Sequence, residues 1–379
     1  MRLLVTLMVL LLLQPFAVSA GYAAGSDQPP PTAIINKRID DLVKAAVNRG
    51  GIAGYSLVVL KDGKVIHQSG YGFADQAKKV PVTPQTAFGL ASVTKTFTAL
   101  ALLSLVEKGK LRLDDPLSKH LTGLPTAWKK LTLRQLASMT AGVPNDIPRE
   151  KPWPEEMAIV QTMPLLFTPG SRYAYSNPSY RTLGTVIERV TGKPYLQYLR
   201  ETVLSPLAMK STGTREELEK LTTVSQPFGF NQRTGNAVLL RYKPTEISFS
   251  SGMLFSNTAD MAKYAQALLD HKLFSASSYD TLFVSRPPLT TGAQSNWAFG
   301  WGVERKKSYG GRLVCGMNGG NPGVASTILL VPEEKLAIVG LSNVYSPAAY
   351  RIPRMVAQAV LNLKTSGGAG TGEAQELSF

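Results

Sequence analysis

One apolar segment constrains the fold more than any other part of the sequence. Between Ser92 and Lys108 the residues are apolar on almost every side of the expected helix, and Gly109 follows directly. A helix without a polar face has to be buried among other elements, and a glycine is a common stop at a helix C-terminus. The sequence therefore predicts a central, buried helix that the rest of the chain covers.

This helix begins with Ser92-Val93-Thr94-Lys95. Residues three apart share one face of a helix, so the amine of Lys95 could take the proton that Ser92 loses when it becomes a nucleophile. The helix N-terminus also presents backbone N–H groups that have no partner within the helix. The tetrapeptide is weak evidence by itself, and the alternative is a first-turn lysine with its amine in solvent.

The histidine content narrows the choice of catalytic base. The chain has three histidines, His67, His120 and His271, and none of them stands in a setting that suggests a base. No G-x-S-x-G segment surrounds Ser92. Both observations disfavour a Ser-His-Asp triad on an α/β-hydrolase fold. A serine enzyme with this sequence needs a different base, and Lys95 is the candidate.

A second candidate segment is Tyr175-Ser176-Asn177, which follows Pro169-Gly170-Ser171. A tyrosine near Ser92 and Lys95 could relay a proton to the leaving group, and Asn177 could orient the substrate and hold the lysine. The alternative is a turn with a packed tyrosine and an Asx cap.

A third candidate segment runs from Gly316 to Gly320, and we predict Asn318, Gly319 and Gly320 as substrate-binding residues. We expect a glycine-rich turn that leaves a strand ending near Cys315. Such a turn lets a substrate approach closely and can present a backbone N–H to an oxyanion. The alternative is an ordinary hairpin turn.

Strand-like runs lie at both ends of the chain, and helical patterns lie between them. Ile52–Leu60 and Lys64–Gly70 flank a hairpin turn at Lys61-Asp62-Gly63. The later strand candidates are Phe299–Glu304, Arg312–Gly316, Ala325–Leu330 and Leu336–Leu341. This order predicts a discontinuous α/β domain from residues 34–114 and 225–364, with a helical domain of residues 115–224 inserted in it.

The two ends of the sequence indicate export. Residues 1–20 resemble a secretory signal, with Arg2, an apolar core from Leu3 to Leu13 and small residues before Ala20. The alternative is an uncleaved membrane anchor, but the apolar run is short for a membrane span. We expect a secreted or periplasmic protein without a stable membrane anchor, with a flexible lead-in at residues 21–33 and a disordered tail at residues 365–379.

Charge and cysteine content limit the partners. The net charge of +15 either favours anionic surroundings, such as cell-wall carboxylates or lipid headgroups, or reflects a dispersed, solvated surface. Lys and Arg form no long run and no basic motif interleaved with aromatic residues, so we expect no nucleic-acid partner. The single cysteine, Cys315, is expected to be a packing residue. No Cys and His cluster resembles a metal site, and we expect no metal and no cofactor.

Taken together, these motifs resemble the serine β-lactamase and penicillin-binding superfamily, and in particular its class C-like branch, which includes D-aminopeptidases and carboxylesterases. The resemblance covers roughly residues 35–360. Further segments that carry it are Phe88–Phe97, Leu113-Asp114-Asp115-Pro116, Pro206-Leu207-Ala208-Met209 and Gly319–Gly323.

The resemblance implies a β-lactamase/transpeptidase-like fold, an antiparallel sheet flanked by helices with an inserted, mostly helical domain. It implies Ser92 as the nucleophile, Lys95 and Tyr175 as the acid/base pair, and Asn177 as support. It also implies an oxyanion hole formed by the backbone N–H groups of Ser92 and Gly320.

Two departures from the family pattern bear on the substrate. Met317 stands where β-lactamases have the lysine of Lys-Thr-Gly and many relatives have a histidine, and Met139-Thr140-Ala141-Gly142 stands where the family has His-Thr-Ser-Gly. Met317 cannot pair with a substrate carboxylate, and Arg312, Lys306 or Lys307 are candidates to supply a cation instead.

We therefore expect a serine hydrolase that cleaves a small-molecule or peptide ester or amide, which could be derived from the cell wall, rather than an efficient β-lactamase. The alternative is a cell-wall or penicillin-binding protein with low or no turnover on the same scaffold.

Overall fold

The computed structural model describes residues 32–49, 51–145, 152–153, 155–230, 237–240, 245–284, 286 and 288–363. The expected signal segment and tail, and all but the end of the expected lead-in, lie outside these residues. None of the helices in these ranges is both long enough and apolar enough to cross a membrane.

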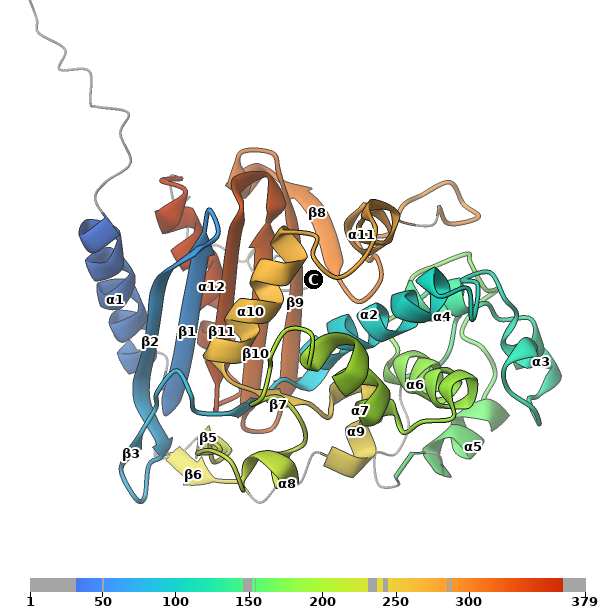
Figure 1. Ribbon diagram of the computed structural model, residues 1–379, viewed down its shortest axis with the longest axis horizontal. Coiled ribbons are helices and arrows are strands. Elements are labelled where there is room, and N and C mark those ends of the chain that lie inside the picture. The colour runs from blue at the N-terminus through green and yellow to red at the C-terminus, as the bar shows by residue number, and fades with distance from the viewer. Residues whose placement is uncertain are drawn as a thin grey trace, which may run out of the picture. The chain divides into compact units, whose positions relative to one another are not determined.

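A seven-stranded sheet lies at the centre of the described fold (Figure 1). In spatial order its strands are β3 (Val80–Pro81), β2 (Lys64–Asp75), β1 (Gly54–Lys61), β11 (Leu336–Ser342), β10 (Val324–Val331), β9 (Arg312–Asn321) and β8 (Gly302–Lys306). Every neighbouring pair is antiparallel. Because β1 pairs with β11, strands from near the two ends of the described chain lie side by side. The predicted antiparallel sheet is confirmed.

Helices cover both faces of this sheet. On one face, α1 (Thr32–Arg49) packs against α12 (Pro347–Val360), which contacts β10 and β11. On the other face, α10 (Thr258–Leu269) contacts β1 and β11, and α11 (Ala276–Phe283) contacts α2 (Thr94–Glu107). Figure 1 shows α10 in front of the strands and α12 behind them. Each face thus has an apolar core of its own.

The chain between β4 (Phe88–Gly89) and β7 (Phe255–Ser256), which pair with each other, is mostly helical. Its helices are α2, α3 (Thr126–Lys129), α4 (Leu133–Ala137), α5 (Glu155–Thr162), α6 (Asn177–Thr191), α7 (Tyr195–Leu199), α8 (Arg215–Leu218) and α9 (Thr245–Gly252). A small pair, β5 (Phe228–Phe230) and β6 (Ala237–Leu239), lies among them in sequence. This part of the chain also contains the short turns η1 (Ala91–Val93), η2 (Leu117–Lys119) and η3 (Arg200–Leu204). Two further short turns, η4 (Lys307–Tyr309) and η5 (Pro332–Glu334), follow strands β8 and β10.

The described residues from Thr32 onward belong to one compact unit. The proposed division into residues 34–114 with 225–364 and residues 115–224 therefore stays a prediction.

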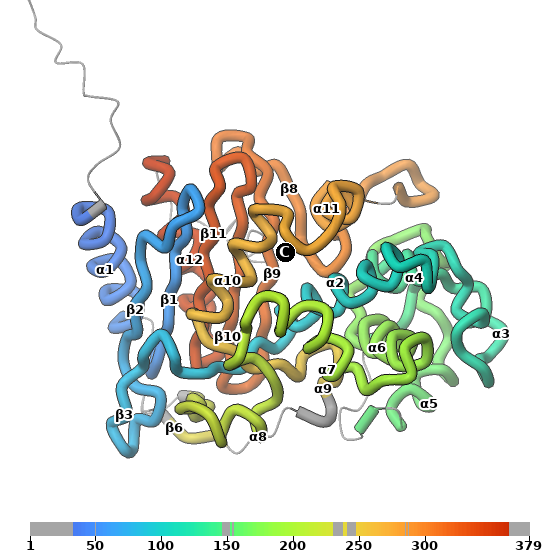
Figure 2. The backbone as a smooth tube through the Cα atoms, in the orientation of Figure 1, coloured from blue at the N-terminus to red at the C-terminus, as the bar shows by residue number. Residues whose placement is uncertain are grey.

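The predicted buried helix is confirmed as η1 followed by α2. Every residue from Thr94 to Leu105 is buried, including Lys95. The helix runs from the sheet, where η1 touches β9 and β10, to the surrounding helices, where it contacts α6 and α9 (Figure 2). This placement explains why the sequence of α2 has no polar face.

The prediction of a turn from Gly316 to Gly320 is wrong, because all of these residues lie inside β9. The turn comes later, between Asn321 and Val324, which pair with each other. Strand β8 pairs with β9 only as far as Gly316, so the last part of β9 is an edge. A glycine within a strand often marks a place where another backbone approaches closely.

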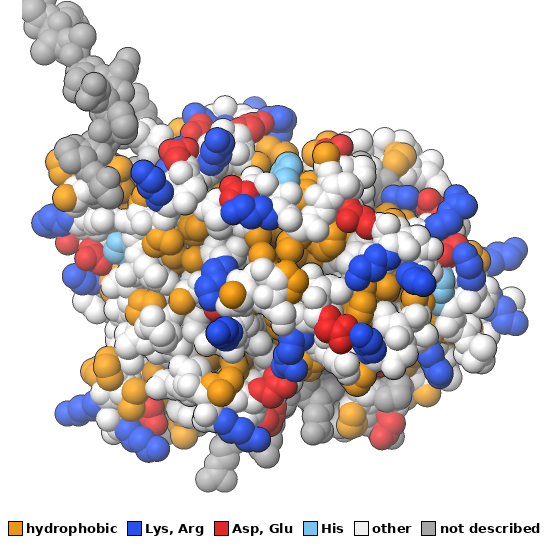
Figure 3. Space-filling view, in the orientation of Figure 1, with side chains coloured by type: hydrophobic (Ala, Val, Ile, Leu, Met, Phe, Trp, Pro, Cys, Tyr) orange, Lys and Arg blue, Asp and Glu red, His pale blue; other side chains and the backbone are white. Residues whose placement is uncertain are grey.

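The surface charge is dispersed on the face seen in Figure 3. Lys and Arg side chains are spread over this face and lie among Asp and Glu side chains. Of the two explanations for the net charge of +15, this face agrees with a solvated surface of mixed charge.

Candidate active site

Ser92 lies in a strained turn between β4 and α2. The residue before it, Ala91, has a φ of 43°, a left-handed conformation that costs energy for any residue with a Cβ. Ser326 of β10 donates a hydrogen bond from Oγ to the carbonyl oxygen of Leu90 at 2.6 Å. The sheet thereby holds the turn that presents the half-buried Ser92 side chain.

The amine of Lys95 is enclosed by hydrogen-bond acceptors. Lys95 is fully buried, and its Nζ lies 3.0 Å from Ser92 Oγ. The same Nζ donates to Asn177 Oδ1 at 2.7 Å and to the carbonyl oxygen of Ser251 at 2.9 Å. It also lies 4.9 Å from the centre of the Tyr175 ring. The alternative of a solvent-exposed lysine is wrong.

Tyr175 approaches Ser92 from the other side. Its hydroxyl donates to Ser92 Oγ at 2.7 Å, and its ring meets the ring of Trp297 edge-on, with 5.7 Å between ring centres. The backbone of the preceding residue, Ala174, donates to the carbonyl oxygen of Met139 at 3.0 Å. The segment that replaces the family's His-Thr-Ser-Gly therefore still positions the tyrosine through its backbone.

Asn177 is the first residue of α6, but it does not cap that helix. The cap is Ser176, whose Oγ accepts a hydrogen bond from the backbone of Ser179 at 3.1 Å. The backbone N–H of Asn177 donates to Asn145 Oδ1 at 2.9 Å, and its own side chain accepts from Lys95. The Asx-cap alternative is therefore wrong, and the side chain points at the lysine.

The edge of β9 packs against the turn that carries Ser92. A Cβ added to Gly319 would lie 2.2 Å from the carbonyl oxygen of Leu90 and 2.9 Å from the backbone nitrogen of Ser92. Asn318 points elsewhere: its Oδ1 accepts a hydrogen bond from Thr327 of β10 at 2.9 Å. The structure thus brings Gly319 and Gly320 to the candidate site and leaves the Asn318 side chain on the neighbouring strand.

These residues surround a cavity of about 340 Å³. Its lining consists of Ser92, Asn145, Tyr175, Asn177, Arg181, Ser248, Ser251, Gly252, Gly320, Asn321 and Pro322. Sequence reasoning missed the contribution of α9, because a cluster of serines and a glycine is typical of a loop. Within α9, Phe249 has a φ of 36°, which interrupts the helix. No local pattern in the sequence indicates that this segment reaches Lys95.

Among the described residues that line the cavity, Arg181 of α6 carries a positive charge. It is 3% exposed and forms an ion pair through Nη1 with Glu156 of α5, which is fully buried. The predicted cations lie elsewhere. Arg312 begins β9 at the end opposite Gly320 and pairs with Glu334, Lys306 pairs with Glu304, and Lys307 begins η4. The suggestion that one of these three replaces the family's lysine is therefore wrong.

Met317 belongs to the apolar core. Its side chain is 2% exposed and packs in the cluster that also contains Cys315. Burial raises the pKa of the Cys315 thiol, so this cysteine is a poor nucleophile. Strand alternation places Met317 and Gly319 on one face of β9 and Asn318 on the other.

The three histidines have other partners. His67 Nε2 lies 2.9 Å from the hydroxyl of Tyr71, and His120 Nε2 lies 3.1 Å from Asp115 Oδ2. His271 stacks on the ring of Tyr279. In the ranges that the structure covers, no group of three or more Asp, Glu, His or Cys residues could hold a metal ion.

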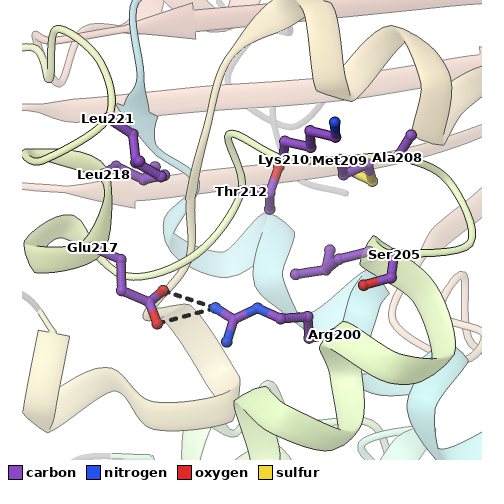
Figure 4. A pocket seen from close by; sticks show the side chains of 10 residues that line it. Arg200, Ser205, Ala208, Met209, Lys210, Thr212, Glu217, Leu218 and Leu221 are labelled. Carbon is purple, nitrogen blue, oxygen red and sulfur yellow. Dashed lines mark hydrogen bonds and ion pairs between the residues drawn. The ribbon is translucent and has the colours of Figure 1, made fainter.

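A second cavity, of about 500 Å³, lies beside η3 and α8 (Figure 4). Its lining is Arg200, Leu204, Ser205, Ala208, Met209, Lys210, Thr212, Glu217, Leu218 and Leu221. Arg200 and Glu217 face each other across it and form an ion pair. The cavity contains none of the predicted catalytic residues, so the smaller cavity at Ser92 is the candidate active site.

Comparison with known proteins identifies the family of this chain. Residues 39–362 match the Beta-lactamase family. Protein flp of Staphylococcus aureus (strain MW2) is 28% identical over 345 residues, which is 86% of this chain and 67% of that protein.

Two solved structures are similar as well. The octameric penicillin-binding protein homologue from Pyrococcus abyssi superposes with a TM-score of 0.77 at 25% identity, over 86% of this chain and 78% of its own. D-amino acid amidase from Ochrobactrum anthropi SV3, solved with D-phenylalanine, gives a TM-score of 0.75 at 25% identity, over 87% of this chain and 99% of its own. From its sequence and its fold, the chain belongs to the β-lactamase family of serine hydrolases and penicillin-binding protein homologues.

Proposed function

We propose that the protein is a secreted serine hydrolase that cleaves an ester or a neutral amide through an acyl-enzyme on Ser92. One observation carries this proposal. Ser92 Oγ lies between a fully buried amine, Lys95 Nζ at 3.0 Å, and a phenol, Tyr175 at 2.7 Å, at the wall of a cavity. A nucleophile within hydrogen-bond reach of a base, which other groups orient in turn, is the arrangement that covalent catalysis requires.

Acylation begins when Ser92 Oγ attacks the carbonyl carbon of the substrate while neutral Lys95 takes the hydroxyl proton. Full burial disfavours the charged form of a lysine. In the neutral form, Lys95 donates its two N–H groups to Asn177 Oδ1 and to the carbonyl oxygen of Ser251. Its lone pair is then left to point at Ser92.

The tetrahedral intermediate carries its negative charge on the former carbonyl oxygen. We assign the backbone N–H groups of Ser92 and Gly320 as donors to this oxygen, because both residues line the cavity and β9 runs against the Ser92 turn. Removing a single donor of this kind costs about 100-fold to 1,000-fold in rate.

Collapse of the intermediate breaks the bond to the leaving group. Tyr175 gives its proton to the departing oxygen or nitrogen and regains a proton from protonated Lys95. Water then attacks the ester on Ser92, with the same groups moving protons in reverse, and releases the acid.

Two residues support an uncharged acyl group. Met317, which replaces the family's cation, is buried in the apolar core and has no charge, and Arg181 in the cavity lining is already paired with Glu156. The similarity to a D-amino acid amidase supports amide cleavage, and the similarity to a penicillin-binding protein homologue supports a cell-wall-derived substrate. A penicillin-binding protein with low or no turnover remains the alternative, because it would use the same acylation chemistry.

Active-site labelling tests the proposal. A fluorophosphonate probe and a fluorescent penicillin are incubated with the wild type, with Ser92→Ala and with Ser248→Ala. Ser248 lines the same cavity and controls for the loss of a serine there. We expect the Ser92→Ala variant alone to lose labelling, with the adduct mapped to Ser92 by peptide mass spectrometry. Persistent labelling of Ser92→Ala would remove Ser92 as the nucleophile.

A substrate panel separates the two candidate functions. p-Nitrophenyl esters, D-amino-acid amides and nitrocefin are followed over many turnovers. Steady turnover of an ester or amide supports the hydrolase. A burst of one equivalent followed by no turnover, together with retention on peptidoglycan, would support the binding protein instead.

Export is part of the proposal and has its own test. The full-length chain is expressed in a bacterial host, and the N-terminus of the product in each compartment is sequenced. A mature protein that begins at Gly21 outside the cytoplasm is the expected result, and an intact N-terminus in the cytoplasm would contradict it.

A further inference from the structure

The ion pair between Arg181 and Glu156 calls for an explanation. Both residues are buried, at 3% and 0% exposure, and taking two charges out of water is energetically costly. Because apolar residues of similar size often stabilise a fold as well as or better than such a pair, stability alone is a weak reason for it. Arg181, one member of the pair, lines the candidate active site.

The guanidinium of Arg181 has a second partner in that wall. Its Nε donates to Ser251 Oγ at 3.1 Å, and Ser251 Oγ donates to the carbonyl oxygen of Ser248 at 2.6 Å. The carbonyl oxygen of Ser251 in turn accepts a hydrogen bond from Lys95 Nζ. A chain of contacts therefore runs from Glu156 through Arg181 and Ser251 to the lysine.

The backbone around Ser251 depends on such contacts. Two residues earlier, Phe249 has a φ of 36° and a ψ of −141°, so α9 is two short helical turns joined by a kink. This non-helical residue breaks the regular helix just before Ser251, so side-chain contacts to Ser251 can help to set the direction of its carbonyl. Arginine suits this role because its rigid fork can bind a carboxylate and a hydroxyl at once.

We propose that Arg181 is a positioning residue for the base: anchored by Glu156, it holds Ser251 so that the Ser251 carbonyl, together with Asn177, directs the lone pair of Lys95 at Ser92. This inference rests on the proposed function of Ser92 and Lys95. The contacts described for Arg181 are with Glu156 and Ser251, and it acts on Lys95 through Ser251, so its removal should slow proton transfer without abolishing acylation.

Two variants and their combination test this inference. Arg181→Lys keeps a positive charge beside Glu156 but lacks the planar fork through which Nη1 contacts Glu156 while Nε contacts Ser251. Ser251→Ala keeps the carbonyl and the ion pair but removes the hydroxyl that Arg181 binds. The matched controls are Arg134→Lys, which shortens an arginine fork paired with Asp114 at the surface, and Ser104→Ala, which removes a buried hydroxyl of α2 that contacts Tyr198.

The measurements are the rate of fluorophosphonate labelling at Ser92, and kcat and KM for an ester that the panel identifies. We expect each variant to lower the labelling rate and kcat by about 10-fold to 100-fold, as displacements of about 1 Å in active sites do, with KM changed less than threefold. The double variant should be no slower than the slower single variant, because both act through one contact. Both controls should react at the wild-type rate.

The outcomes separate this inference from the proposed function. Wild-type rates in Arg181→Lys and Ser251→Ala, or fully additive losses in the double variant, would overturn the positioning role while Ser92 keeps its assignment. A loss of thermal stability without a loss of kcat would reduce the ion pair to a structural element and also overturn the role. If the wild type does not react at Ser92 at all, the proposed function fails and this inference falls with it.

Discussion

Gly319 and Ser92 lie so close together that no side chain fits between them. A Cβ on Gly319 would lie 2.9 Å from the backbone nitrogen of Ser92 and 2.2 Å from the carbonyl oxygen of Leu90. Both atoms belong to the backbone and cannot move aside cheaply. The edge of β9 and the nucleophile turn are therefore packed as one unit.

Gly319→Ala should push β9 away from this turn. We expect the rate of acylation to fall at least 100-fold, the scale for losing one oxyanion donor, as measured by labelling at Ser92. Gly320→Ala is the neighbouring comparison, because its Cβ would meet the side chains of Tyr345 and Tyr350, which can rotate. Equal losses in the two variants would contradict the close backbone approach as the cause.

Tyr175→Phe should discriminate between leaving groups. If Tyr175 protonates the leaving group, an alkyl ester or an amide should lose about 100-fold or more in kcat/KM, within the range for general acid catalysis. A p-nitrophenyl ester should lose much less, since p-nitrophenolate leaves without a proton. The measurement is kcat/KM for a series of esters that share one acyl group. The same loss across the whole series would assign Tyr175 to nucleophile activation instead.

Met317→Lys tests whether the family's cation can simply be restored. Because Met317 is 2% exposed in the apolar core, an unpaired ammonium there should lower the free energy of unfolding by about 3 kcal/mol or more. Met317→Leu is the control, and it should cost less than about 1.5 kcal/mol. Urea unfolding measures both values. A stable Met317→Lys protein with faster turnover of a carboxylate-bearing substrate would show that the lysine reaches the cavity.

Asp115 should contribute an acid-sensitive part of the stability. Burial raises the pKa of its carboxyl group, but hydrogen bonds from Lys119, the backbone of Arg112 and His120 outweigh this and lower the pKa from 3.8 to about 2. Since the pKa is lower in the folded state, the ionised carboxylate stabilises the fold above about pH 4. That contribution is lost as the pH falls towards about 2.

The comparison for this prediction is Asp115→Asn against the wild type in urea unfolding at several pH values. The gap between the two midpoints should be widest near neutral pH and should close between pH 4 and pH 2. Asp41→Asn, which removes an exposed carboxylate on α1, should show little effect at any pH. A gap that stays constant down to pH 2 would contradict the assignment.

Several features of the fold were predictable because their causes are local. The all-apolar pattern from Ser92 to Lys108 requires a buried helix, and the glycine in Lys61-Asp62-Gly63 favours the turn that joins β1 and β2. A capping box at Thr132 and Gln135, which is also a local pattern, opens α4. The prediction for the segment from Gly316 to Gly320 is wrong because the cause of its conformation is not local. Glycines are typical of turns, and only the backbone of a distant segment, at Leu90 and Ser92, shows why they lie inside a strand.

The candidate site also contains one relationship set by local sequence and others set by contacts between distant segments. The sequence by itself determined that Ser92 and Lys95 lie one helical turn apart, because spacing along one helix sets that relationship. Only the tertiary structure decided that Lys95 is buried between Asn177 and Ser251, which are 82 and 156 positions away in the chain. It also decided that Arg181, paired with Glu156, lines the cavity. A contact between distant segments depends on how whole elements pack, so the residue pattern within one segment does not predict it.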